Sequence, residues 1–594
     1  MLRVLPDSRF WLSCICLIAL TVLAPRPVGA EALPTLKADR FNFFMTNRFT
    51  GQSKGFAYAL VHKNQTVTDG AVGWAQEPRD GNVRMTTSVP SNIGSVSKLI
   101  TGVALLHLLR ESPIEDGTVN QQLDVEIVDY LPRDWRSKYR AGLKELTFRH
   151  LLQHKSGLKH EKDTQSGWSK LEYALSQGTS TAGKERVYNN NNISLMRFLI
   201  PQIAYPNETA FIDNLHKGKS RKAYWDAVLP QYNALYKKYM NQYFFPKIFS
   251  GTYPVCNPYD ELGPKTFAKA YSGDKKGYFP RPDFCAPQGG FYFSVRQLAQ
   301  FAKIYNQTNK LVSSGIRKRM MKPNNIDDRL VFNKRISTDH FIDETGLTHW
   351  VYHGGSFKGY AAAFIKLPDG HFGVAVANTD TVSSTDLASA LYYAFVYATK
   401  GLPAEHLAAN DKNHFAYRDG VYITSGSSNN HDTERGLYRG SLGGGRSWDE
   451  VFDISANKRF HFAWFKDQHR LRVMRGHSDD LDRDKQPYIS RIDPNFVMSQ
   501  LKFISSNDDM HFGWYDTGGN LWVSAGPSND LAGKRRAESV KLAPGKKPHE
   551  IVAIASNNRQ HFAFYDDCTL SSGTSDNLAS SYSGRTYDCF DLLK

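Results

Sequence analysis

The stretch SNIGSVSKLITG, residues 91–102, places two serines and one lysine within four positions, directly before an apolar run. The run LITGVALLHLLRE, residues 99–111, leaves almost no polar face, so a helix here is predicted to be buried. Lysine is among the side chains least often buried in proteins. A lysine at the start of such a helix therefore requires an explanation in terms of chemistry.

The spacing of these residues supplies that explanation. Positions three apart share one face of a helix, so Ser95 and Lys98 are predicted to face each other while Ser97 points elsewhere. Burial disfavours the charged ammonium and lowers the pKa of a lysine. A neutral amine can accept the serine proton, and a helix N-terminus favours the resulting negative charge. The pattern predicts Ser95 as a nucleophile activated by Lys98.

Two hairpins frame the segment that contains this helix. FAYALVHKNQTVTDGAVGWA, residues 56–75, alternates apolar residues around a polar turn at 63–65, and AAAFIKLPDGHFGVAVANT, residues 361–379, does so around Pro-Asp-Gly. Helical patterns such as 99–111 and 295–307 lie between them. The expected fold class is α/β (α+β), an antiparallel sheet closed by both ends of the domain and flanked by helices.

The first thirty residues have the features of a signal peptide. Arg3 and Arg9 precede an apolar stretch, residues 10–24, and a small-residue cleavage site that ends at Ala30. Fifteen apolar residues are short for a retained anchor, the alternative interpretation, because a span needs about 20. We expect cleavage of residues 1–30, an exported protein that is periplasmic or extracellular, and no later membrane span.

Four cysteines remain after that cleavage. They fall into two local pairs, Cys256 with Cys285 and Cys568 with Cys589, and an even number in an exported chain favours disulfides. Four cysteines allow three connectivities, so the pairing stays open. Their spacing predicts no zinc site, and no metal or cofactor is expected.

Past residue 400 the sequence repeats. LAANDKNHFAY (407–417), ISANKRFHFAW (454–464), ISSNDDMHFGW (504–514) and IASNNRQHFAF (554–564) share an aliphatic residue, two small residues, Asn, and a later His-Phe pair. Periods near 50 residues with short strands are typical of β-propeller blades. We expect a boundary near 400–406 and a four-fold, propeller-like, all-β repeat domain over residues 403–594.

The repeated histidines, His414, His461, His511 and His561, admit two interpretations. Each could contribute to a metal or sugar site. Alternatively, Asn and His could hold the same turn in every repeat through side-chain to backbone hydrogen bonds, which identical spacing supports equally well and which we favour. The repeats as a whole could still bind a cell-envelope polymer or a protein.

Five ordered motifs resemble the superfamily of serine β-lactamases and penicillin-binding proteins, in particular the class C β-lactamase-related hydrolases. The resemblance covers roughly residues 38–398, and we expect the domain to span residues 31–402. Residues 202–287 form an unusual insertion, expected to be a lid or wall of the site. The motifs are GSVSK (94–98), LTFRHLLQHKSGL (146–158), VYNNNNISLM (187–196), QGGFYFSVRQLAQF (288–301) and HGGSFKGYAAAF (353–364).

The resemblance implies a role for each matching residue. Ser95 would form an acyl-enzyme, with Lys98 and Tyr188 sharing the general acid and base work, and Lys98 would lower the pKa of the Tyr188 phenol. Asn190 would hydrogen-bond Lys98 and a substrate amide. The backbone N–H groups of Ser95 and Ser356 would form an oxyanion hole. The remaining expected site residues are His353, Gly354 and Gly355, at the start of the strand motif.

The strand motif also departs from the family pattern. Members that recognise penicillin carry Lys at its first position, where this chain has His353, and a hydroxyl residue at its second, where this chain has Gly354. We therefore expect hydrolysis of an ester or amide in a small molecule or peptide. The alternatives are a D-Ala-D-Ala peptidase or β-lactamase, and a non-catalytic binding protein that uses the repeats.

Composition limits the class of partner. The formal net charge of +16 could favour anionic envelope polymers or lipid headgroups, although a solvated basic surface is the simpler interpretation. No nucleic-acid-binding motif is present in the sequence, and export argues against such a partner.

Overall fold

The computed structural model describes residues 36–400 and 404–586 apart from short gaps. The predicted signal peptide and the Cys568–Cys589 pair lie outside the described residues. Within the described chain, no helix combines the length and the apolar character that crossing a bilayer requires. The gaps are 50–51, 140–142, 160–167, 180–182, 184, 274, 280–284, 322–328, 333, 338–348, 411–412, 419–421, 428–429, 440–441, 443–450, 467–469, 478–480, 482–487, 518 and 566–568.

An antiparallel sheet organises the first part of the chain, as predicted. The described residues form seven paired strands in the order β3-β2-β1-β9-β8-β7-β6. Strand β1 pairs with β9, with Phe56 opposite Ala377 and His62 opposite His371, so strands from both ends of the domain meet in the middle of the sheet. The bounds are β1 Gly55–His62, β2 Gln65–Gln76, β3 Val83–Arg84, β6 Lys334–Ser337, β7 His349–Phe357, β8 Tyr360–Lys366 and β9 His371–Ala377.

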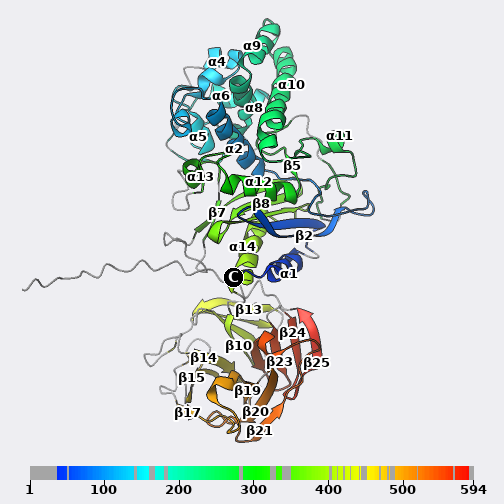
Figure 1. Ribbon diagram of the computed structural model, residues 1–594, viewed down its shortest axis with the longest axis vertical. Helices are drawn as coiled ribbons and strands as arrows, with labels where there is room; N and C mark the ends of the chain where they lie inside the picture. The colour runs from blue at the N-terminus through cyan, green and yellow to red at the C-terminus, as the bar shows by residue number, and fades with distance from the viewer. Residues whose placement is uncertain are drawn as a thin grey trace, which may run out of the picture.

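Helices cover both faces of this sheet (Figure 1). Helices α1 (Ala38–Phe49) and α14 (Ser384–Lys400) pack together on one face, and α2 (Val96–Glu111) and α12 (Val295–Gln307) pack on the other. The other elements are α3 Val119–Gln122, η1 Ile127–Tyr130, α4 Arg133–Tyr139, α5 Phe148–Leu152, α6 Trp168–Ser176, α7 Asn190–Ser194, α8 Met196–Ala204, α13 Ser314–Met320, η6 Pro368–Gly370, and the paired β4 Ser91–Asn92 and β5 Tyr292–Phe293.

The segment 202–287 is largely helical. It contains α9 (Pro206–Leu215) and the long helix α10 (Arg221–Tyr239), followed by η3 (Met240–Phe244), η4 (Phe245–Lys247) and α11 (Pro258–Leu262). Helix α10 packs on α8, and its aromatic residues, Trp225, Tyr232 and Tyr236 among them, are fully buried. The Tyr236 hydroxyl lies 3.0 Å from the Thr101 hydroxyl on α2. This contact places the segment against the helix that begins at Ser95.

Four antiparallel sheets follow from residue 404 within the described residues (Figure 1). Their first strands, β10, β14, β18 and β22, are neighbours in turn, and β22 also contacts β10, so the sheets form a closed propeller-like ring. The bounds are β10 Ala404–Ala409, β11 His414–Arg418, β12 Tyr422–Ser427, β13 Asn430–Arg439, β14 Val451–Ala456, β15 His461–Lys466, β16 Leu471–Gly476, β17 Tyr488–Ser490, η8 Met498–Gln500, β18 Leu501–Ser506, β19 His511–Thr517, β20 Asn520–Gly526, β21 Arg535–Ser539, η9 Pro548–Glu550, β22 Ile551–Ser556, β23 His561–Tyr565, β24 Thr569–Thr574 and β25 Asn577–Thr586.

The repeated Asn closes the turn between the first two strands of each sheet. The Asn507 Oδ1 accepts hydrogen bonds from the backbone N–H of residues 509 and 510, at 3.0 and 2.8 Å. Asn457 and Asn557 do the same in their own sheets, and Asn410 accepts one such bond from the N–H of Asn413. These bonds confirm that the conserved spacing of Asn reflects turn structure.

The repeated histidines and small residues connect neighbouring sheets. Nδ1 of His511 lies 2.6 Å from the Ser506 hydroxyl, which in turn donates to Ser455 in the preceding sheet at 2.6 Å. His561 contacts Ser556 in the same way. Burial lowers the pKa of His511 to about 3, so its imidazole is neutral and bonded within the protein. The prediction that the histidines also hold the turn through backbone hydrogen bonds is wrong for His511 and His561, whose Nδ1 atoms contact serine hydroxyls instead. The side chain of His414 lies outside what the structure describes.

Replacing Asn507 with Ala is expected to lower the free energy of unfolding by about 1–2 kcal/mol, because two backbone N–H groups lose their acceptor. Urea unfolding followed by far-ultraviolet circular dichroism measures the change. Lys502→Ala, at an exposed position of strand β18, five residues before Asn507, serves as the control and should shift the midpoint little. Equal stability of Asn507→Ala and the control would contradict the role of this turn.

Candidate active site

Ser95 is the exposed point of an otherwise buried segment. It lies at the N-cap of α2, and among residues 91–109, all of which the structure describes, it alone is not buried. The Asn92 side chain accepts the Gly94 N–H at 2.8 Å and fixes the turn that leads into the helix. Ser95 is half-buried, whereas Ser97 is fully buried and its oxygen accepts the Phe291 N–H.

Lys98 lies one helical turn from Ser95, as the spacing predicted. Its side chain is fully buried, and Nζ donates to the Ser95 Oγ at 2.9 Å and to the Gln288 carbonyl oxygen at 2.8 Å. Burial lowers the pKa of the Lys98 ammonium to about 7. A substantial fraction of this amine is therefore neutral at neutral pH and able to accept a proton.

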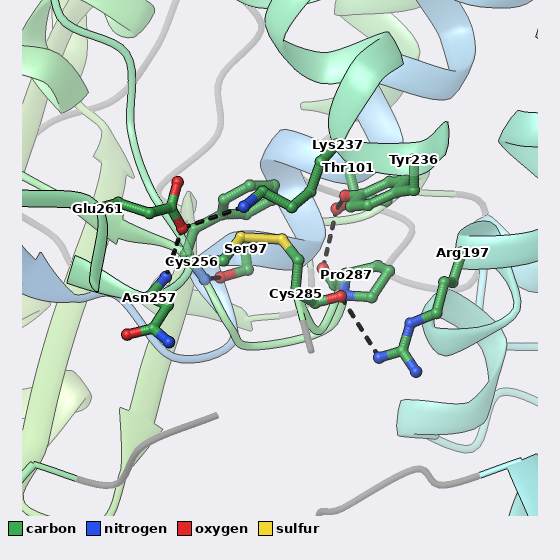
Figure 2. The surroundings of a disulfide bond; sticks show 11 residues. Ser97, Thr101, Arg197, Tyr236, Lys237, Cys256, Asn257, Glu261, Cys285 and Pro287 are labelled. Carbon is green, nitrogen blue, oxygen red and sulfur yellow. Dashed lines mark hydrogen bonds and ion pairs between the residues drawn. A yellow bond between two sulfur atoms is a disulfide. The ribbon is translucent and has the colours of Figure 1, made fainter. Parts of the chain in front are cut away.

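The Gln288 carbonyl belongs to a loop that follows a disulfide, and Figure 2 shows this disulfide together with Pro287. Cys285 is bonded to Cys256, one of the two local pairs that the sequence favoured. Between the disulfide and Gln288, the Pro287 carbonyl accepts the Thr101 hydroxyl at 2.8 Å. The loop is thus held both to α2 and to the segment around Cys256, which fixes the oxygen that contacts Lys98. The QGG motif (288–290) contains this acceptor, but no side chain in the motif indicates the role of the Gln288 backbone oxygen.

Tyr188 joins the same cluster. Its phenol hydrogen-bonds Ser95, and Lys98 Nζ lies 5.1 Å from the centre of its ring. Burial raises the pKa of Tyr188 to about 12, and the Ser95 hydrogen bond and the Arg186 cation oppose this only in part. The expectation that a nearby cation lowers this pKa is therefore wrong, because desolvation of a phenolate outweighs the attraction. Tyr188 is a neutral proton donor near pH 7.

His154 is a neighbour that the sequence reasoning did not assign. Its ring packs on Tyr188 with the centroids 4.6 Å apart. Nδ1 lies 3.2 Å from both the Asn189 N–H and the Asn192 amide nitrogen, so Nδ1 is the acceptor of the ring. Burial, followed by the Arg186 and Lys98 charges, holds the pKa of His154 well below its usual range. A neutral imidazole ring therefore packs against the phenol ring of Tyr188.

Strand β7 passes beside the helix start with an open edge. Among the described residues, strand β6 pairs with β7 as far as Tyr352, and no β6 partner is described for β7 from His353 onward. A Cβ on Gly355 would lie 2.0 Å from the Ile93 carbonyl oxygen and 3.0 Å from the Ser95 nitrogen, so only glycine permits this approach. Strands β7 and β8 are joined by a two-residue turn, Lys358–Gly359, in which both residues have a positive φ. In such a hairpin the residues that flank the turn, Phe357 and Tyr360, form the first pair joined by backbone hydrogen bonds.

This register sets the direction of the next backbone group. Because N–H directions alternate along a strand, the Ser356 N–H points toward the open edge of β7, on the side of the Ser95 turn. A Cβ on Gly94 would lie 2.6 Å from the Ser356 nitrogen, which shows how closely the two backbones approach. The backbone of Ser356 therefore lies beside the turn that carries Ser95.

His353 lies in the cluster but is not a cation. Its side chain is fully buried, Nδ1 contacts the Gly354 carbonyl oxygen at 2.9 Å, and Nε2 has no hydrogen-bond partner among the described residues. Burial, aided by the Lys98 charge, lowers the pKa of His353 to about 3. The imidazole of His353 is therefore neutral near pH 7.

The expected hydrogen bond between the Asn190 side chain and Lys98 is not seen among the described residues. Asn190 lies at the start of α7, half-buried, and its carbonyl oxygen accepts the Ser194 hydroxyl. No hydrogen bond connects its side chain to Lys98 within the described residues, where the Gln288 carbonyl oxygen is the second acceptor of Nζ. The side chain remains available to a substrate.

Replacing Lys98 with Met tests the cost of burying this amine. The folded-state pKa of about 7 lies below the usual value near 10.4, so the unfolded chain binds more protons between these pH values and the stability of the wild type rises with pH there. Between pH 7 and 10 the difference in free energy of unfolding should move in favour of the wild type by on the order of 4 kcal/mol.

Urea titrations at several pH values measure this difference. Lys310→Met removes an exposed lysine and should show a difference that is flat with pH. A flat difference for Lys98→Met as well would mean that the amine is not desolvated.

Comparisons with known proteins identify the family of this chain. The Beta-lactamase family model matches residues 44–399. No curated protein matches the chain. Similar solved structures include FmtA from Staphylococcus aureus, at 16% identity and TM-score 0.44 over 63% of this chain and 92% of that chain.

Two further solved structures have comparable scores. The octameric penicillin-binding protein homologue from Pyrococcus abyssi has 14% identity and TM-score 0.42 over 82% of this chain and 97% of that chain. A β-lactamase/D-alanine carboxypeptidase from Pseudomonas syringae has 15% identity and TM-score 0.44 over 59% and 97%. Because the family match spans more than half of the sequence, the chain belongs to the Beta-lactamase family of serine hydrolases.

Proposed function

We propose that this protein is an exported serine hydrolase that cleaves an ester or amide through an acyl-enzyme on Ser95. One observation carries the proposal: a fully buried Lys98 amine, with its pKa lowered to about 7, lies 2.9 Å from the only accessible side chain of its segment as the structure describes it. This arrangement activates a hydroxyl without any charged partner.

The acylation step follows from the contacts around Ser95. The Ser95 oxygen attacks the substrate carbonyl carbon while its proton passes to Lys98 Nζ. The Gln288 carbonyl oxygen stabilises the ammonium that forms. The N–H groups of Ser95 and Ser356 donate to the negative oxygen of the tetrahedral intermediate.

The leaving group departs with a proton. Tyr188 remains a neutral phenol because of its raised pKa, so it acts as the donor rather than as a resting base, and Lys98 restores its proton. Water then attacks the acyl carbon with the neutral Lys98 amine as base, which releases the acid and regenerates Ser95. Asn190 is assigned to a substrate amide, since its side chain is not bonded to Lys98.

The substrate class follows from the charge of the strand motif. A neutral, buried His353 offers no ammonium to a substrate carboxylate, and Gly354 offers no hydroxyl. This favours an ester or a neutral amide over a substrate that ends in a carboxylate. A D-Ala-D-Ala peptidase or β-lactamase activity remains the second candidate, favoured by the family match.

A binding protein that acts through its repeats is the third candidate. We propose that the chain divides near residues 400–406 and that residues 403–594 bind a cell-envelope polymer or a protein beside the hydrolase. Intact placement of Ser95, Lys98 and Tyr188 argues against a degenerate hydrolase. Loss of turnover in Ser95→Ala separates this candidate from the other two.

Ser95→Ala is expected to lower hydrolysis by about 10³-fold or more, whereas Ser97→Ala retains much of it because Ser97 only bonds the Phe291 N–H. Intact-protein mass spectrometry after exposure to esters, D-peptides and penicillins measures the acyl adduct. The wild type and Ser97→Ala should gain the acyl mass, and Ser95→Ala should not. A stable adduct with penicillins but none with esters would favour the second candidate, and an adduct on Ser95→Ala would refute the assigned nucleophile.

Tyr188→Phe is expected to slow amide hydrolysis far more than hydrolysis of a p-nitrophenyl ester of the same acyl group. An amine must be protonated to leave, whereas p-nitrophenolate leaves without a proton, so only the first reaction needs the phenol. Steady-state rates on the matched pair of substrates measure the ratio. Tyr173→Phe, which removes an exposed hydroxyl bonded to Lys159, is the control. Equal losses on both substrates would assign Tyr188 to the attack step instead.

A further inference from the structure

Helix α9 lies at the end of the molecule that is farthest from the ring of repeat sheets (Figure 1). One face of this helix packs inward through Thr209, Ile212 and Asp213, which are buried. On its outward face, the side chains of Phe211 and Leu215 are 65% and 57% exposed. Residues four apart are neighbours on the surface of a helix, so a phenyl ring and an isobutyl group are presented together to the surroundings.

A third exposed ring adjoins the start of α9. Tyr243, in η3, is 51% exposed, and its ring centroid lies 6.3 Å from that of Tyr205, the residue before α9. The Lys238 Nζ lies 4.5 Å from the centre of the Tyr205 ring and 3.8 Å from a Glu208 carboxylate oxygen. Exposed apolar groups therefore occur near both ends of α9, whereas a single exposed apolar side chain would need no explanation.

The segment that follows α9 is strongly basic. HKGKSRK, residues 216–222, contains four cationic residues and no acidic one. The four, all exposed, are Lys217, Lys219, Arg221 and Lys222. Lys222 pairs with Asp226, and Arg221 donates to Glu172. No ion pair of Lys217 or Lys219 is found within the described part of the chain, so two ammonium groups without a carboxylate partner there follow Leu215 closely.

These cations border a cavity of about 430 Å³ at the junction of α4, α9 and α10. Its charged lining residues are Arg133, Lys217, Lys219, Arg221, Asp134 and Asp213. Asp213 is buried, and its carboxylate accepts the Arg133 N–H and two tyrosine hydroxyls, so donors of the protein already engage its charge. The N-cap of α10, Ser220, makes no side-chain hydrogen bond to the first turn, which leaves backbone N–H groups there for an anion. The cavity therefore has the chemistry to accept a phosphate group.

We propose that α9 and residues 216–222 form a docking surface for a bilayer that contains anionic phospholipids. Phe211 and Leu215 enter the interfacial region of the bilayer, while headgroup phosphates meet Lys217, Lys219 and the cavity beside them. Reversible attachment of a protein to a membrane surface depends on buried apolar area together with electrostatic attraction, and this surface supplies both.

Charge and apolar exposure together select a lipid surface over two other partners. A soluble anionic polymer would engage the lysines but would leave Phe211 and Leu215 in water. A second copy of the chain that packed α9 against α9 would cover these apolar side chains. It would also bring two basic segments together, because a two-fold interface places the same surface on both sides, and like charges repel.

The docking surface is remote from Ser95. The Tyr236 hydroxyl of α10 contacts Thr101 on α2, and Arg221 lies fifteen residues before Tyr236 in the same helix. At 1.5 Å per residue this separation is roughly 22 Å. Docking therefore needs no change at the hydrolase site, and the proposal is independent of the proposed function.

Sedimentation with lipid vesicles tests the surface. The exported protein, with its mass measured to establish that residues 1–30 are absent, is mixed with vesicles of phosphatidylglycerol and phosphatidylcholine, or of phosphatidylcholine alone. The apparent affinity should be at least about tenfold higher for the vesicles that contain phosphatidylglycerol. It should fall as the salt concentration rises, because exposed charges are screened.

Substitutions separate the two attractions. Lys217→Gln combined with Lys219→Gln should weaken binding to the anionic vesicles by about twentyfold, at roughly fivefold for each lysine. Phe211→Ser should weaken it by about tenfold, because no phenyl ring then leaves water. Lys310→Gln and Val497→Ser are the matched controls, since both residues are exposed and lie outside the surface, and they should bind as the wild type does. The replaced side chains are all exposed, so the thermal midpoint should stay the same in every variant.

Equal vesicle binding by the wild type and these variants, or no vesicle binding by the wild type, overturns the proposal. Binding of soluble polyphosphate that survives Phe211→Ser, with no binding of vesicles, would assign the surface to a polymer instead. A dimer in analytical ultracentrifugation that Phe211→Ser dissociates would assign it to a second copy and would equally overturn the proposal. Hydrolysis of a soluble ester should be the same in all variants; its absence from the wild type would count against the proposed function and not against the docking surface.

Discussion

The burial of one amine is the constraint on which the hydrolase site depends. Lys98 lies at the start of a helix that is buried on every side, and its two hydrogen bonds, to Ser95 and to the Gln288 carbonyl, replace the water that it loses. Such burial is costly for a charged group, and the protein reduces the cost by letting the amine become neutral. Loss of the proton lowers the free-energy cost of burying Lys98, and it also leaves a neutral amine that can act as a base.

The surroundings of the amine have the same character. His154 and His353 are buried and Tyr188 is half-buried, and desolvation keeps all three neutral near pH 7. No carboxylate hydrogen-bonds to Ser95 or Lys98 in the part of the chain that the structure describes. The site is therefore a desolvated set of proton donors and acceptors whose order of basicity is fixed by burial rather than by ion pairs.

Sequence reasoning reached the features that depend on local spacing. Ser95 and Lys98 are three residues apart in one helix, and the Asn and His of the repeats recur at nearly constant intervals, so their relative positions follow from secondary structure. The central pairing of β1 with β9 followed from two hairpin patterns at the ends of the domain. These inferences needed no knowledge of tertiary packing.

Tertiary packing decided the features that were missed. The Gln288 carbonyl that accepts a hydrogen bond from Lys98 lies in a loop 190 residues away in the sequence. Every residue has a backbone carbonyl, so the sequence does not indicate which one contacts the amine. The raised pKa of Tyr188 and the neutral state of His353 depend on how much protein covers each group, which a motif does not encode. Likewise, His62 and His371 are distant in sequence and meet only because of strand register.

The closed order of the repeat sheets has a consequence for how this part of the chain folds. Strand β10 contacts β22 as well as β14, so the first sheet finds its second neighbour only in the fourth. Contacts of such high sequence separation raise the contact order and delay the last favourable interaction until every sheet has formed. An open arc of three sheets would leave two inner strands uncovered, so the ring should gain its stability in a single concerted step rather than sheet by sheet.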